Sequence, residues 1–346
     1  MRVPLLFRGA VAAAIVSFAA AALLVPPAQA ADFSKSKHIT LRLTSASPAG
    51  MEDSLALKDA AAWLEKASDG TVALDLHFSS SLFGEIPGLE AAQSGLVDMA
   101  IACTCNMTKL TDSMLFSDLP YIWQKMDNGR AVWDSEIGDN IRKEMVAKLG
   151  LRPVAFTPSG GGYRIFWNTK RAVRVPADAA GLKVRTTATP IEQHFWESVG
   201  AIPTPVDVAE IYTALDQGLV DGEHLQPVWL QLLKHNEVVK YGTEIQAEAV
   251  YRGLLINEKS YDKLDAAQKP VFDKAMKMFE DKAYEYNREL RGKAMKAIAG
   301  SGVKVIDLNQ DELAKWREVG HALWKTDVVK SHVDQATIDK VLELQK

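Results

Sequence analysis

The chain has 346 residues, with 40 basic and 44 acidic side chains, a formal net charge of -4 at pH 7 and a hydrophobic share of 47%. Charges of both signs are spread along the whole length, so no basic stripe is present for a phosphate backbone, and nucleic acid is not expected as a partner. The length and the hydrophobic share are sufficient for two domains of ordinary size, each with its own core.

Residues 1–30 have the layout of a secretory signal peptide. Arg2 and Arg8 precede an apolar run over 10–25, and the run is followed by prolines and small residues. A retained membrane anchor is the alternative, but the run is shorter than the roughly 20 residues that a spanning helix needs. We predict export to the periplasm with cleavage before Ala31.

Strands and helices alternate in the first half of the chain. Apolar patterns predict strands at 38–44, 71–78 and 96–102, and helical spacing predicts helices at 52–66 and 85–94. Such alternation is typical of βαβ units. We therefore expect an α/β protein with parallel-rich sheets flanked by helices.

A second series follows and indicates a second lobe. Strands are predicted at 151–157, 163–167 and 182–186, with helices near 191–199 and 209–216. No low-complexity linker separates the two series, so the connections are expected to be packed strands that act as hinges.

A long helical pattern, rich in Ala, Lys, Glu and Met, runs from 266 to about 300 and is expected to brace both lobes. The predicted organisation is a signal peptide at 1–30, lobe I at 31–155 with later segments crossing back, lobe II at 156–255, and the bracing helix with C-terminal helices at 256–346.

The two cysteines, Cys103 and Cys105, are separated by one residue. If this segment ends a strand, both thiols point to the same face at a separation that would strain a bridge between them. A redox or metal role would need further ligands, and the seven histidines are scattered. We expect free or loosely coupled thiols, and no metal or cofactor.

Several short motifs together resemble the substrate-binding proteins of tripartite ATP-independent periplasmic (TRAP) transporters, the DctP-like family, over nearly the whole chain after the leader. The motifs are Ser-Pro-Ala-Gly at 47–50, Ser-Leu-Phe-Gly-Glu at 81–85, Gly-Leu-Val-Asp-Met at 95–99, Leu-Pro-Tyr at 119–121, Gly-Tyr-Arg at 162–164, Gly-Leu-Lys-Val-Arg at 181–185, Gly-Ala-Ile-Pro-Thr-Pro at 200–205, and the stretch 210–222 that ends in Val-Asp-Gly. The resemblance implies a two-lobed fold that closes over an organic acid, with a long helix across both lobes.

Two arginines are the principal binding candidates. The resemblance implies that Arg185 pairs with the ligand carboxylate and that Arg164 is a second family arginine. A guanidinium presents planar, paired donors that match the two oxygens of a carboxylate, and such a bond strengthens when a cleft closes and loses water. The alternative for Arg185 is an ion pair at a strand end.

The sequence departs from the family after the Val-Asp-Gly turn, where Leu225 stands at a position at which asparagine is common. His224 or Gln226 must then supply any polar contact there, although His224 could equally be a satisfied core or surface histidine. Glu85 either caps a helix or binds ligand hydroxyls.

Lobe I is expected to close with residues near Ser47, Glu85 and Thr104. Several aromatic side chains could form a wall suited to an aromatic or branched acid, although most of them are expected in the core. The complete predicted ligand-binding set is Arg185, Arg164, Glu85, Ser47, Thr104, His224, Gln226, Trp167, Tyr212 and Trp229.

These features predict a periplasmic solute-binding protein, monomeric or homodimeric, that delivers a small organic acid to the small and large membrane subunits of a TRAP transporter. A component that feeds a membrane sensor is one alternative, and a periplasmic hydrolase is another. No catalytic residues are predicted, because Gly160-Gly161-Gly162 lacks the Lys-Ser/Thr ending of a phosphate loop, and there is no Gly-x-Ser-x-Gly elbow or His-Glu-x-x-His helix.

Overall fold

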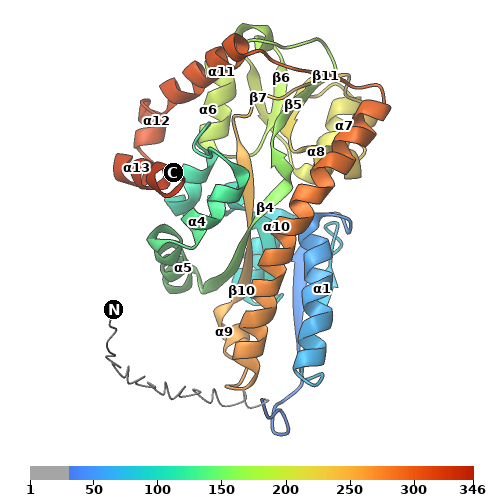
Figure 1. The fold of residues 1–346 in the computed structure, drawn as a ribbon, viewed down its shortest axis with the longest axis vertical. Coiled ribbons are helices and arrows are strands. Elements are labelled where there is room, and N and C mark those ends of the chain that lie inside the picture. The colour runs from blue at the N-terminus through green and yellow to red at the C-terminus, as the bar shows by residue number, and fades with distance from the viewer. Residues whose placement is uncertain (1–30) are drawn as a thin grey trace, which may run out of the picture. The chain divides into compact units, whose positions relative to one another are not determined.

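Two sheets flanked by helices organise residues 31–346, the part of the chain that the structure, a computed structural model, describes (Figure 1). The predicted signal peptide lies outside the described residues. No helix within residues 31–346 combines the length and the apolar character needed to cross a membrane.

The first sheet has five strands in the order β2-β1-β3-β10-β4. They are β1 (Ile39–Ser45), β2 (Val72–His77), β3 (Met99–Cys103), β4 (Leu151–Tyr163) and β10 (Ala249–Asn257). Strand β1 pairs in parallel with β2 and β3, whereas β10 runs antiparallel to both β3 and β4. Every residue of β3 and β10 is buried, as expected for strands covered on both faces.

The second sheet has six strands in the order β11-β9-β5-β8-β6-β7. They are β5 (Ile165–Asn168), β6 (Lys183–Thr186), β7 (Ile202–Pro205), β8 (Gly222–Leu225), β9 (Tyr241–Thr243) and β11 (Lys304–Ile306). Its antiparallel pairs both involve β5, which pairs with β8 and β9, and the remaining pairs are parallel.

Helices cover both sheets. The longer ones are α1 (Glu52–Ala67), α2 (Glu85–Ser94), α5 (Glu136–Leu149), α6 (Pro190–Ser198), α10 (Gln268–Gly300), α11 (Gln310–Leu323) and α13 (Gln335–Leu344). The shorter ones are α3 (Thr104–Met107), α4 (Gly129–Trp133), α7 (Ile211–Asp216), α8 (Pro227–Leu232), α9 (Glu258–Tyr261) and α12 (Asp327–Lys330). Short 3₁₀ turns occupy Asp112–Asp118, Met126–Asn128, Pro176–Ala179, Val208–Glu210 and His235–Glu237.

The chain crosses between the sheets at three places, one of them through helix α10 from β10 to β11, and the other two are short. Strand β4 of the first sheet leads through Arg164 directly into β5 of the second, and β9 of the second sheet leads through residues 244–248 into β10 of the first. Strand β10 thus lies in the first sheet although the range predicted for lobe II contains most of it. Apart from Arg252, its residues are mostly apolar and fit between β3 and β4, where both faces are covered.

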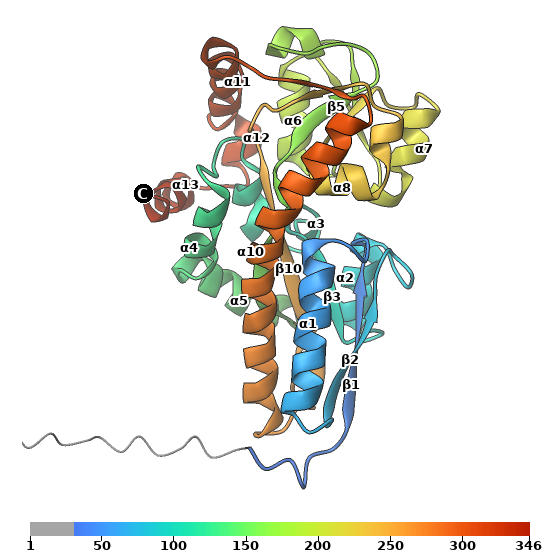
Figure 2. The ribbon, with the colours of Figure 1, turned by 45° about the vertical axis from the view of Figure 1, so that its right-hand side comes forward.

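Helix α10 contacts both halves of the fold, and Figure 2 shows it beside α1. Its first half buries Phe272, Met276 and Phe279 in the core of the first sheet, while Ala294 and Ile298 near its end lie in the core of the second. The two-lobed α/β fold and the long helix predicted from the sequence are therefore confirmed.

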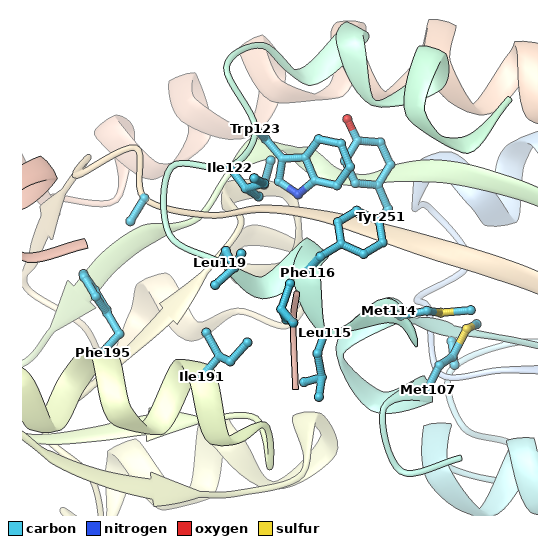
Figure 3. Close-up of a cluster of buried hydrophobic side chains, with 14 of the residues drawn as sticks. Met107, Met114, Leu115, Phe116, Leu119, Ile122, Trp123, Ile191, Phe195 and Tyr251 are labelled. Carbon is cyan, nitrogen blue, oxygen red and sulfur yellow. The ribbon is translucent and has the colours of Figure 1, made fainter. Parts of the chain in front are cut away.

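A third apolar cluster connects segments that are far apart in the sequence (Figure 3). It joins Phe116 and Trp123, which follow α3, to Tyr251 of β10 and to Phe195 of α6. The rings of Trp123 and Tyr251 lie 4.6 Å apart between centroids. Aromatic pairs at this separation contribute beyond the area that they bury, so this cluster fixes the position of β10.

Candidate functional site

A cavity opens where the two sheets meet, with about 360 Å³ of empty space that includes some open solvent. Its walls come from both sheets and from the crossing segments between them. The lining residues are Glu85, Cys103, Cys105, Asn106, Ser159, Arg164, Arg185, Thr187, Val208, Leu225, Gln226, Trp229 and Val250. Five of the sequence-predicted residues are among them: Arg185, Arg164, Glu85, Gln226 and Trp229.

Arg185 is a buried cation without a carboxylate partner. Strand β6 turns Lys183 outward to solvent but leaves Arg185 only 5% exposed. The Nε of Arg185 donates to the Val206 carbonyl at 2.9 Å, and no carboxylate oxygen of the described residues lies within 4.0 Å of its guanidinium. Burial lowers the pKa of Arg185, and the more distant charge of Glu192 opposes that shift. The guanidinium is therefore available to an anion in the cavity.

Arg164, in contrast, is neutralised by the protein itself. Its Nη1 is paired with Glu192 and lies 3.0 Å from a carboxylate oxygen of Glu248. Burial opposes the charge of Arg164, but these two carboxylates raise its pKa. Its Nη2 lies 3.9 Å from the Sγ of Cys105, at the cavity wall. Arg164 can still donate a hydrogen bond to a ligand, although its charge is already balanced.

A buried polar cluster surrounds Arg164. Burial raises the pKa of Asp118 to about 7 and also raises that of Glu248, while burial lowers the pKa of His224 well below its ordinary value. Donor atoms of Glu192, His224 and Glu248 lie within 4.8 Å of one another, which is the grouping in the described residues that could hold a metal ion. Because the cation of Arg164 already lies against both of these glutamates, the arrangement favours the guanidinium over a metal.

Glu85, the first residue of α2, faces the cavity but is also neutralised. Arg252 of β10 is fully buried and pairs with Glu85 at 2.6 Å and with Asp53 at 3.1 Å, and its guanidinium lies 5.2 Å from the ring centroid of Trp229. The second oxygen of Glu85 accepts from the Asn106 amide. Arg252 was not among the predicted residues, although a charged residue inside the mostly apolar stretch 249–256 is a signal for it.

Cys103 and Cys105 form a disulfide at the cavity wall, and the expectation of free thiols is wrong. That expectation placed both residues on one strand. In the structure β3 ends at Cys103 and α3 begins at Thr104, so the chain turns between the two cysteines and their Cα atoms approach to 5.1 Å. This separation is within the ordinary range for a disulfide.

The other five predicted residues do not line the cavity. Ser47 donates to Asp53 at 2.6 Å, Thr104 donates to the Tyr251 carbonyl at 3.2 Å, and Trp167 donates to the Leu225 carbonyl at 2.9 Å. His224 is fully buried beside Trp196. Tyr212 lies on α7, and its hydroxyl donates to Glu237 at the protein surface. Sequence periodicity gives the face of an element on which a side chain lies, but not what that face meets.

Besides the arginines, two amide side chains of the lining remain open to a ligand. The Gln226 amide makes no hydrogen bond to another described residue and is only 3% exposed, and the Asn106 side-chain oxygen is likewise without a donor in the described part of the chain. The sequence analysis missed Asn106, together with Ser159 and Thr187. Their small polar side chains carry no spacing signal.

A cavity between two sheets, enclosed by two strand crossings and carrying a buried unpaired cation, defines a two-lobed binding protein for a small anion. Residues 45–331 match the family model of bacterial extracellular solute-binding protein, family 7. The chain belongs to this family.

Relatives and solved structures agree with that placement. The C4-dicarboxylate-binding periplasmic protein DctP of Rhodobacter capsulatus is 29% identical over 258 residues, 74% of this chain and 76% of the relative. A TRAP periplasmic solute-binding protein of Shewanella oneidensis, solved with bound succinate, is similar in fold with a TM-score of 0.84 at 19% identity, covering 89% of this chain and 100% of that one. Another from Polaromonas, bound to D-erythronate, has a TM-score of 0.79 at 24% identity and covers 88% and 98%.

Proposed function

We propose that this protein captures a small organic acid in the periplasm through Arg185 and delivers it to the small and large membrane subunits of a TRAP transporter. The observation that carries the proposal is the guanidinium of Arg185, which lines the cavity, is almost fully buried and has no carboxylate partner among the described residues. A buried charge is costly unless it is paired, so a site that keeps one unpaired favours a ligand of opposite charge.

The mechanism begins with an anion on the second sheet. The carboxylate accepts from Arg185, and Nη2 of Arg164 and the Gln226 amide assist. The first lobe then closes over the ligand with Glu85 and the Cys103–Cys105 pair, while the crossings at Arg164 and at residues 244–248 act as hinges. Loss of water on closure strengthens each of these hydrogen bonds, because the local dielectric falls.

Family membership supports a role in binding rather than in catalysis, since family 7 consists of solute-binding proteins. The same membership favours delivery to a transporter over a membrane sensor or a hydrolase. Export with cleavage before Ala31 belongs to this proposal, because the relative from Rhodobacter capsulatus is named as a periplasmic protein.

The test is a thermal-shift screen of organic acids on the mature protein, followed by titration calorimetry. A ligand that binds only the folded state raises the melting temperature by mass action. At least one acid should do so, and Arg185→Met should abolish the shift while Lys183→Ala, an outward residue of the same strand, keeps it. A stabilising acid that acts equally on the Arg185 variant would reject the proposal.

A further inference from the structure

The charges that line the cavity restrict the kind of acid it can take. Arg164 and Arg185 are its cationic residues, and Arg164 is paired with two glutamates. The first-lobe wall presents the carboxylate of Glu85, whose cation Arg252 is shared with Asp53. A second carboxylate on the ligand would therefore be buried without a free cation, which is strongly unfavourable.

The hydrogen-bonding groups of the lining are also largely used. Both oxygens of Glu85 have donors, Ser159 accepts from the Trp229 indole at 3.1 Å, and Thr187 donates to Glu192. The Ser159 hydroxyl can still donate one hydrogen bond, the Gln226 amide can donate to the carboxylate, and the open Asn106 side-chain oxygen can accept from one ligand hydroxyl. A ligand with a hydroxyl on each carbon would leave its hydroxyls beyond these few groups without partners.

Part of the lining is apolar. The Cys103–Cys105 disulfide and Val250 form a buried cluster of their own, and Val208, Leu225 and Trp229 continue the apolar surface. A disulfide has no hydrogen to donate and offers polarisable sulfur for van der Waals contact. This wall suits a hydrocarbon chain.

We propose that the site selects a short monocarboxylate whose carboxylate lies on Arg185 and whose aliphatic body packs against the Cys103–Cys105 disulfide and Val250. This inference rests on the proposed function and narrows its ligand to one chemical class. It sets this chain apart from the named dicarboxylate-binding relative and from the neighbours solved with succinate and D-erythronate.

The experiment compares three four-carbon acids and one five-carbon acid that differ away from the carboxylate, by titration calorimetry on the mature protein with its disulfide intact. Butanoate should bind at least about tenfold more tightly than succinate or D-erythronate, and 3-methylbutanoate should bind more tightly still. Arg185→Met should abolish binding of each acid that binds.

The possible outcomes separate the two proposals. If succinate or D-erythronate binds best, and only when Arg185 is present, the proposed function stands and the monocarboxylate inference is overturned. If acids bind but none depends on Arg185, the proposed function falls as well. If no acid of the set binds, the monocarboxylate inference falls, while the wider screen continues to test the function.

Variants of the apolar wall test the packing directly. Val250→Thr keeps the side-chain shape and adds a hydroxyl, so affinity for 3-methylbutanoate should fall roughly tenfold while that for D-erythronate is unchanged or improved. The Cys103→Ser/Cys105→Ser double variant should likewise lower the affinity for 3-methylbutanoate and leave that for D-erythronate unchanged or improved. Leu96→Ala, on the exposed turn before β3, is the control. An equal change for both acids would overturn the assignment of this wall.

Discussion

Replacing each of the two cavity arginines by methionine should have opposite consequences. Within residues 31–346 of the ligand-free protein, Arg185 makes one hydrogen bond, to the Val206 carbonyl, and no ion pair, and burial already lowers its pKa. Arg185→Met removes a poorly compensated buried charge, and this gain offsets the lost hydrogen bond of about 1 kcal/mol. The unfolding free energy should therefore change by no more than about 1 kcal/mol in either direction.

Arg164→Met removes the partner of two buried carboxylates. Glu192 and Glu248 would be left unpaired, and breaking a buried ion pair in this way costs about 3–5 kcal/mol. Urea unfolding without ligand should show this loss for Arg164→Met and not for Arg185→Met.

For ligand affinity the ranking of the two variants should reverse, with Arg185→Met the more damaging. Truncating one partner of a buried charge pair costs about 2–5 kcal/mol of affinity, so Arg185→Met should weaken Kd for the best acid by roughly 30- to 5,000-fold in calorimetry. If Arg185→Met lost as much stability as Arg164→Met while its Kd stayed near that of the wild type, Arg185 would be a structural residue and the reasoning from its missing partner would be refuted.

Three further predictions concern the surroundings of the cavity. Arg252→Met leaves Asp53 and Glu85 without their cation and should lower the unfolding free energy by about 3–5 kcal/mol in urea titrations; a loss under 1 kcal/mol would contradict that role. Burial raises the pKa of Asp118 to about 7 from an ordinary 3.8, so its stabilisation is complete below about pH 4 and is lost as the pH rises through about 7. Asp118→Asn should remove up to about 4 kcal/mol of this fall in stability, and parallel pH profiles for variant and wild type would argue against it. Gly160→Ala should destabilise by about 2 kcal/mol or more, since φ is +67° there and the new Cβ would lie 2.4 Å from a neighbouring side chain; unchanged thermal melting would show that the strand relaxes.

Local features of the sequence were sufficient for the class of fold. The apolar run of β3, the alternation of strands with helices and the periodicity of α10 all depend on neighbours within a few residues, and such signals can be read from the chain alone. The first and last residues of the strands and helices were predicted less accurately. The strand predicted from residue 96 begins at Met99, because Gly95 adopts φ +80° and places the intervening residues in a turn.

The sequence by itself determined the two-lobed α/β architecture and, through its motifs, drew attention to Arg164 and Arg185. Only the tertiary structure decided which of these cations is already neutralised, because Glu192 and Glu248 come from other parts of the chain. It also decided that the cysteines are bonded and that Trp167 and His224 lie in the core. Charge balance and burial depend on contacts between distant segments, and no local pattern records those contacts.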